Sequence, residues 1–243
     1  MHVHRLAVAV LTIALAAAPA AHATCAFLEL GPSAITRTDA KLPADGGILV
    51  GVGASTTHKP VAGDPSQAKL KATAGGKAVP MIMASLAPGL TVYRPEHAVV
   101  GAVAVAGADT PLTVTFAKDK GPALAAPVVT AVVSTSTLSS DRSGMGGSEV
   151  TVVAVKGVPD AAIALVVYRM KDEEHVPITY GNPAHNLTGA TTVEVYRSGG
   201  HCRGPVLPGQ DYPAADEVVT LAWVDRTGRL SPLSAPIKIT AGK

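Results

Sequence analysis

Two cysteines offer the most readily placed chemistry in this chain. Cys25 lies near the N-terminus, and Cys202 lies in the stretch SGGHCRGP at residues 198–205. A zinc site needs several ligands at short spacings, and a redox pair usually has the spacing C-x-x-C, but neither pattern occurs. Two cysteines in an exported chain usually form a disulfide. We therefore expect a Cys25–Cys202 disulfide, with a metal or redox thiol beside His201 as the alternative.

Other patterns that would indicate catalysis or ligand binding are missing from the sequence. No G-x-S-x-G motif occurs, and the glycine-rich stretches 51–56 and 143–148 do not continue as phosphate-binding loops. The segment KDEEH (171–175) lacks the acidic alternation of a calcium loop and fits a polar hairpin tip. No H-x-x-x-H spacing links the histidines His58, His97, His175, His185 and His201. We predict no catalytic residue, no metal site, no cofactor and no enzymatic activity.

The remaining candidates for a functional site are predicted to lie in loops. Binding surfaces of β-sandwich proteins are usually built from loops at one end of the sandwich. Aromatic and charged side chains that could form such a surface lie beside proline- and glycine-containing stretches. They are Tyr180, His185, Arg203, Asp211 and Tyr212.

The N-terminal segment has the features of a secretory signal peptide. Arg5 gives a positive start, an apolar run follows, and Ala21-His22-Ala23 matches the A-x-A cleavage pattern. The apolar run is shorter than the roughly 20 residues that a membrane span needs, and no second such run occurs. We expect residues 1–23 to be removed, which leaves Thr24 first and no membrane span. A cut after Ala21 would instead expose His22, a nitrogen ligand suited to copper.

Charge and composition exclude some partners. The formal net charge is only +2, and lysines and arginines form no cluster, whereas nucleic-acid binding needs a concentrated basic stripe. Aromatic residues make up 3% of the chain, so stacking platforms for bases are few. The alanine-rich, signal-bearing composition is typical of a bacterial exported protein. We expect a periplasmic or extracellular address and no nucleic-acid partner.

The mature chain divides into two series of short β segments. Several of them alternate apolar and polar residues, as LTVTF does at 112–116. No stretch has the sustained 3.6-residue period of a helix. The predicted strands are 25–30, 47–53, 68–73, 78–86, 90–94, 99–107 and 111–117, followed by 128–135, 149–155, 162–170, 175–180, 191–197, 217–224 and 235–240. The charged, proline-containing stretch KDKGPALAAP (118–127) separates the two series.

This pattern predicts an all-β chain of two antiparallel β-sandwich domains. The first domain spans residues 24–120, a linker spans 121–127, and the second domain spans 128–243. The disulfide would then join the first strand of one domain to a late loop of the other. Such a bridge would hold the two domains at one relative angle.

One segment carries a family resemblance. EVVTLAWVDRTGRLSPLSAPIKIT (217–240) resembles the last hairpin of a fibronectin type III or immunoglobulin-like domain, with Asp225 and Gly228 in the turn and Ser231-Pro232 before the closing strand. LPADGGILV (42–50) resembles the opening of bacterial immunoglobulin-like domains. The resemblance implies β-sandwiches that bind, space or present other molecules, and it carries over no catalytic residue.

Three functions remain from the sequence. The first is a non-catalytic exported binding or envelope-structural protein with a protein or surface polymer as its partner. The second is a periplasmic copper carrier or copper enzyme that uses an N-terminal histidine. The third is an accessory subunit or inhibitor of a secreted enzyme.

Overall fold

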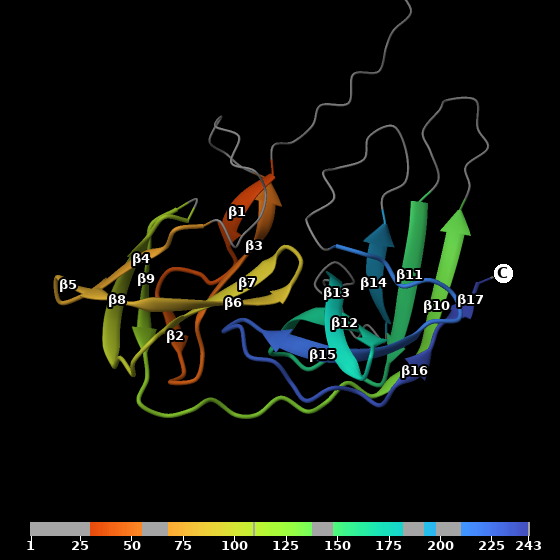
Figure 1. Cartoon of the computed structure of the whole chain (residues 1–243). Coiled ribbons are helices and arrows are strands. Elements are labelled where there is room, and N and C mark those ends of the chain that lie inside the picture. The colour runs from red at the N-terminus through yellow and green to blue at the C-terminus, as the bar shows by residue number, and fades with distance from the viewer. Residues whose placement is uncertain are drawn as a thin grey trace, which may run out of the picture.

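The strands of this protein account for all the regular structure in the part of the chain that can be described. The computed structural model describes residues 30–54, 68–108, 110–137, 148–181, 192–197 and 210–242 (Figure 1). These ranges contain β-strands and no helix, which confirms the all-β prediction. Among the same residues, no helix is long and apolar enough to cross a membrane.

The N-terminal half forms two sheets. Sheet A has the strand order β1-β3-β7-β6, and sheet B has the order β2-β9-β8-β4-β5. The strands are β1 (Leu30–Ala34), β2 (Ala40–Leu42), β3 (Ile48–Ala54), β4 (Lys71–Ala74), β5 (Lys77–Val79), β6 (Met81–Ala87), β7 (Leu90–Pro95), β8 (Gly101–Ala106) and β9 (Leu112–Phe116).

The C-terminal half forms two further sheets after a strand-free connection, residues 117–128. Sheet C has the order β14-β11-β10-β17, and sheet D has the order β13-β12-β15-β16. The strands are β10 (Val129–Thr137), β11 (Ser148–Val155), β12 (Ala162–Lys171), β13 (Glu174–Gly181), β14 (Thr192–Arg197), β15 (Val218–Asp225), β16 (Ile237–Lys238) and β17 (Thr240–Ala241).

The pairing is antiparallel except at one place in each half. β2 runs parallel to β9, and β10 runs parallel to β17. The prediction of purely antiparallel sheets was therefore wrong at these two pairs. Both pairs join an early strand of a half to its last strand.

Strand positions match the sequence prediction most closely where apolar and polar residues alternate. β9 follows LTVTF, with Leu112, Val114 and Phe116 buried and the threonines exposed. The predicted strand 78–86 is wrong as a single element, because Pro80 separates β5 from β6. The predicted strand 235–240 likewise divides into β16 and β17, and the three-residue β2 was not predicted.

Three layers of buried side chains separate the four sheets. The first lies between sheets B and A and includes Phe116 and Tyr93. The third lies between sheets D and C and includes Trp223, the single tryptophan of the chain. The middle layer lies between sheets A and D, so the sheets are stacked in the order B, A, D, C.

The middle layer, which we call the junction core, packs the two halves against each other. Alternate residues of the central strands contribute to it while their neighbours face the other way. On β7, Leu90 and Val92 face the junction core, and Tyr93 faces sheet B. The junction core consists of Leu49, Leu86, Ala87, Leu90, Val92, Ala164, Val166, Tyr168, Ala222 and Val224. The central strands of sheets A and D are therefore buried on both faces.

Candidate functional site

A polar turn at the end of β15 is the most highly connected group of side chains described here. The Asp225 carboxylate is only 3% exposed. Its Oδ1 accepts hydrogen bonds from the Thr227 amide at 2.8 Å, the Thr227 hydroxyl at 2.7 Å and the Arg229 amide at 3.1 Å. Its Oδ2 accepts from Nε and Nη2 of Arg229 at 2.9 and 2.7 Å. A buried carboxylate with this many donors fixes the shape of the turn.

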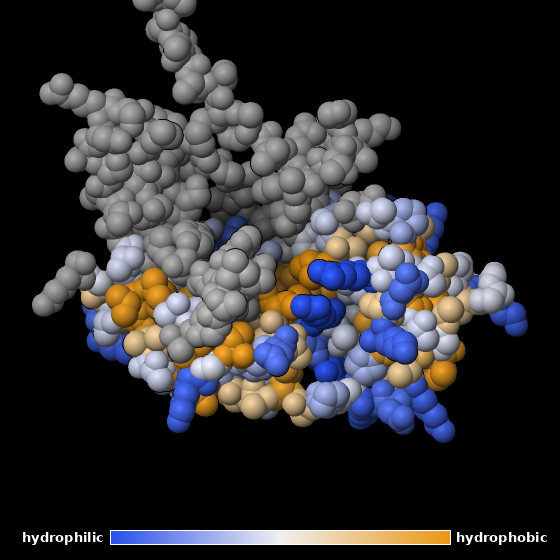
Figure 2. All heavy atoms as spheres, turned by 180° about the vertical axis from the view of Figure 1, so that it is seen from behind, coloured by the Kyte–Doolittle hydropathy of each residue, from blue (hydrophilic) through white to orange (hydrophobic). Residues whose placement is uncertain are grey.

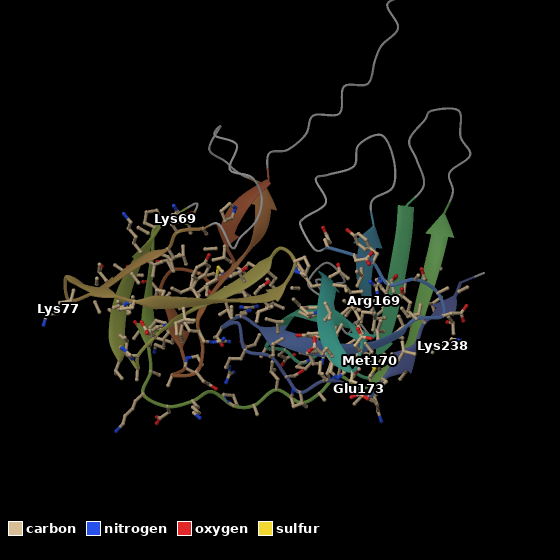
Figure 3. All side chains as sticks on the ribbon, viewed as in Figure 1. Lys69, Lys77, Arg169, Met170, Glu173 and Lys238 are labelled. Atoms are coloured by element: carbon tan, nitrogen blue, oxygen red, sulfur yellow. The ribbon has the colours of Figure 1, made fainter. Side chains whose placement is uncertain are left out.

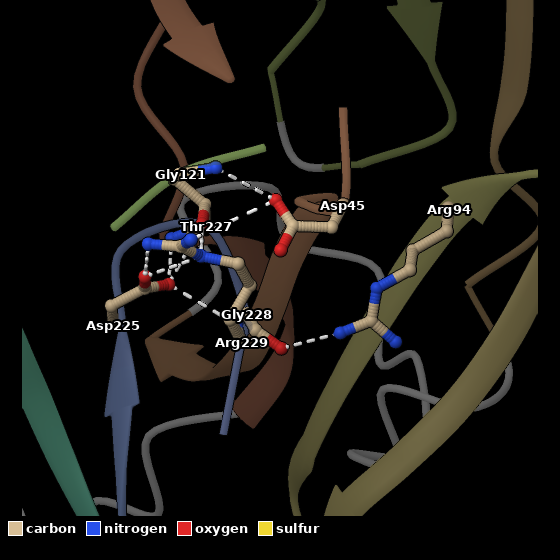
Figure 4. A network of polar contacts seen from close by, with 7 residues as sticks. All are labelled: Asp45, Arg94, Gly121, Asp225, Thr227, Gly228 and Arg229. Carbon is tan, nitrogen blue, oxygen red and sulfur yellow. Dashed lines mark hydrogen bonds and ion pairs between the residues drawn. The ribbon is translucent and has the colours of Figure 1, made fainter. Parts of the chain in front are cut away.

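The turn binds the N-terminal half through its main chain (Figure 4). The Gly47 amide donates to the Thr227 carbonyl at 2.7 Å, and Nη2 of Arg94 donates to the Gly228 carbonyl at 2.7 Å. These contacts join residues more than a hundred positions apart in the sequence. The β15 turn is therefore held by both halves of the chain.

The strand-free connection is drawn into the same network. The Gly121 amide donates to Oδ1 of Asp45 at 3.0 Å, and Nη1 of Arg229 lies 3.7 Å from the same oxygen. Asp45 thus contacts the connection and the C-terminal half at once. We call Asp45, Arg94, Gly121, Asp225, Thr227, Gly228 and Arg229 the polar lock.

Glycines allow the close approach at the polar lock. Gly228 has a φ of +72°, and a Cβ there would meet Cγ2 of Val92 and would lie 2.9 Å from its Cβ. Val92 belongs to the junction core. Gly228 is therefore required twice, once for the left-handed backbone and once for contact with the N-terminal half.

Burial and charge shift the pKa values of Arg94 and Asp45 in the polar lock. Burial lowers the pKa of Arg94, and the charges of Asp45 and Asp225 partly offset this. For Asp45, burial would raise the pKa, but hydrogen bonds from Gly121 and its own amide outweigh it. The charges of Arg229 and Lys120 act in the same direction, so the pKa of Asp45 lies below its ordinary value. The Asp45 carboxyl is therefore charged at neutral pH.

The structure describes three of the five residues predicted to form a binding surface. Tyr180 lies within β13, in agreement with the predicted strand 175–180, and not in the loop surface expected for it. It packs against the junction core, and its hydroxyl lies 3.5 Å from the Gly89 carbonyl. Burial raises its pKa, and nearby Tyr212 adds to this. Tyr212 packs against the core between sheets C and D. His185, Arg203 and both cysteines lie outside the described residues, so the predicted disulfide is not described.

Asp211 and Tyr212 are anchored by an arginine that the sequence prediction did not include. Nη1 of Arg169 contacts Oδ2 of Asp211 at 2.6 Å, and its Nη2 contacts Oε2 of Glu217 at 3.0 Å. Nη2 also donates to the Tyr212 carbonyl at 3.4 Å. The hydrogen bond to Asp211 is the main reason that the pKa of Arg169 is raised. Figure 3 places Arg169 in the C-terminal half, far from Lys69 and Lys77. Through these contacts with Asp211, Tyr212 and Glu217, Arg169 fixes the chain just before β15.

A shallow groove on sheet B has different chemistry. It has a volume of about 310 Å³, and its polar side chains are Thr38, Lys71, Thr73 and Thr113. A single lysine among hydroxyls provides no acid–base pair for general catalysis. Within the described ranges, no three His, Cys, Asp or Glu side chains are grouped as a metal site would require. His22, the copper candidate, lies outside these ranges.

The polar lock therefore joins three segments of the chain, and its carboxylates accept hydrogen bonds from donors of the protein itself.

No protein-family model and no curated protein sequence matches the chain. On the face seen in Figure 2, hydrophobic areas are interspersed with hydrophilic side chains.

Sequence reasoning found part of the polar lock and missed the rest. It placed Asp225 and Gly228 in a turn, which the structure confirms. It missed Asp45, Arg94 and Arg229. The spacing of Asp225 and Arg229 was the available signal, because an acid and an arginine four residues apart around a glycine can close a turn on themselves.

Proposed function

We propose that this protein is an exported, non-catalytic binding or envelope-structural protein made of two immunoglobulin-like β-sandwiches held as one rigid body. The observation that carries the proposal is the junction core with the polar lock beside it. Interfaces between domains that move are smaller and more polar. A fixed pair of sandwiches is suited to hold or space a partner protein or surface polymer.

The strand order of the N-terminal half supports the immunoglobulin-like assignment. Immunoglobulin constant domains have strands ABED in one sheet and CFG in the other, and variable domains extend the second sheet beyond C. If β1, β3, β7 and β6 are lettered A, B, E and D, sheet A has the first order. β9, β8, β4 and β5 then become G, F, C and C′ in sheet B.

The C-terminal half supports a related assignment. Lettered in chain order, sheet C contains E, B and A, and sheet D contains C′, C, F and G. Its buried Trp223 lies on the strand lettered F, whereas antibody domains have their tryptophan on strand C. This half therefore fits the wider fibronectin-like group better than antibody domains.

Export is tested by the intact mass of the protein recovered from its native host. We expect a chain that begins at Thr24 and weighs two hydrogens less before reduction than after it. A chain that retains Met1 would contradict export. A chain that begins at His22 would favour the copper function instead.

Binding is tested by retention of the purified protein on cell-envelope fractions of the same host. Asp211→Ala changes the predicted surface at an exposed position, and Asp160→Ala makes the same charge change at another exposed site. We expect Asp211→Ala to reduce retention and Asp160→Ala to leave it unchanged, with circular dichroism confirming the fold of both. Equal retention of all three proteins would refute this surface as the binding site.

A further inference from the structure

The edge strands of the four sheets differ in how they are protected against pairing with another strand. An edge strand exposes unpaired main-chain N–H and C=O groups, and proteins usually block such edges with charge, proline or very short strands. Among the described strands, seven of the edges are blocked in these ways. β1 contains Pro32, β13 contains Pro177, β14 contains Glu194, β2 and β5 have three residues each with Lys41 and Lys77, and β16 and β17 have two residues each.

The remaining edge strand of the described sheets, β6, has none of these protections. Its seven residues read MIMASLA and contain neither a charge nor a proline. Ile82 is 53% exposed and Met83 is 45% exposed. Adjacent residues of a strand point to opposite faces, so both faces of the edge present an apolar side chain. Figure 1 shows β6, drawn in yellow, as a long strand beside β7.

The hydrogen-bond register identifies which main-chain groups of β6 point outward. The Glu96 amide donates to the Pro80 carbonyl at 2.9 Å, and β6 pairs with β7 so that Ile82 faces Arg94 and Ala84 faces Val92. Bonded and non-bonded pairs alternate along an antiparallel ladder. Ile82 and Ala84 therefore bond to β7, and Met81 and Met83 direct their N–H and C=O groups away from it.

We propose that β6 is a self-association edge, which pairs antiparallel with β6 of a second copy of this chain across a two-fold axis at Ile82. In this register Met81 faces Met83 of the other copy, so their outward N–H and C=O groups bond to each other. The two Ile82 side chains meet at a non-bonded position, where side chains approach most closely.

The chemistry of the edge favours a second copy over another occupant. A two-fold interface places each residue type against itself or its near neighbour, which a charged strand would resist. β6 has no charge to be repelled, and its exposed Ile82 and Met83 would be buried by identical groups. Two four-stranded A sheets would join into one sheet of eight strands. With the axis at Ile82, residues 81–83 of one copy face residues 81–83 of the other, so the pairing ends before the bulge between Ser85 and Ala87.

The test is sedimentation of the expressed chain over a range of concentrations, with variants at the two-fold position. We expect the wild type to dimerise. Ile82→Lys and Ile82→Glu should each weaken dimerisation on the order of tenfold or more, because like charges would face each other across the axis. An equimolar mixture of the two variants should dimerise again, since opposite charges then meet.

Controls separate pairing through β6 from other causes. Val100→Lys adds the same charge at a 67% exposed valine outside the strands and should leave the dimer intact. Circular dichroism should be the same for all variants, because Ile82 is exposed. A monomeric wild type, dimerisation of Ile82→Lys alone at wild-type strength, or failure of the mixture to associate would each overturn the proposal.

Discussion

Gly228→Ala provides the sharpest test of how the two halves are joined. The substitution adds one methyl group at a φ of +72°, where an L-residue costs about 1–2 kcal/mol. The same methyl would overlap Val92 in the junction core, and overpacking of a dense core costs about 1–3 kcal/mol. We therefore expect Gly228→Ala to lower the free energy of unfolding by about 2–5 kcal/mol.

Gly157→Ala separates the two contributions. Gly157 has a φ of +85°, and a Cβ there would have nothing within 4 Å. This control should lose only the backbone contribution of about 1–2 kcal/mol. Urea unfolding followed by the fluorescence of Trp223 measures both variants, because this tryptophan is buried between sheets C and D.

A double substitution identifies the contact responsible. Val92→Ala removes the Cγ2 that the added methyl group would meet and leaves the Val92 Cβ at 2.9 Å, so in this background the cost of Gly228→Ala should fall toward that of Gly157→Ala. Equal losses for Gly228→Ala and Gly157→Ala in the wild-type background would refute close contact between the β15 turn and the N-terminal half.

The other predictions concern the charges of the polar lock. Asp225→Ala should lower the free energy of unfolding by about 3–5 kcal/mol, because Arg229 loses its partner in a poorly solvated site, and urea unfolding beside the exposed control Asp160→Ala checks it. The pKa of Asp45 is lowered by folding, so its carboxylate contributes stability above its ordinary pKa, and that stability disappears as the pH falls through the folded-state pKa. Urea unfolding across the acid range should therefore show the wild type losing its advantage over Asp45→Asn, whereas parallel profiles for the two proteins would contradict this role.

The positions of the strands could be predicted from the sequence better than the sheets against which each strand face packs. Alternation of apolar and polar residues located β9, because that strand is buried on one face. β12 and β15 were also located. Their nearly continuous apolar runs additionally indicate burial on both faces, which was not inferred from the sequence. In β15, Leu221 and Trp223 face sheet C, and Ala222 and Val224 face the N-terminal half. Burial on both faces removes the alternation that would otherwise indicate orientation.

The polar lock was beyond prediction for a different reason. Local chemistry is sufficient for Asp225 to close its own turn, so a turn could be expected there. Asp45 and Arg229 meet only because two sheets stack, and nothing in the residues around either one encodes that contact. The predicted strand 175–180 included Tyr180, and the glycine and proline after it indicated an adjoining loop, whereas β13 continues through Gly181.

Burial of the central strands of sheets A and D on both faces limits how this chain can evolve. A sandwich domain with a polar exterior can be duplicated, exchanged or expressed alone. Here, separation of the halves would expose Leu90 and Val92 on one side and Val166 and Val224 on the other. Each half therefore covers the apolar junction face of the other half and keeps it out of water. Recombination that moved one half into another protein would succeed only with new polar residues across its junction face, so the pair must be inherited together.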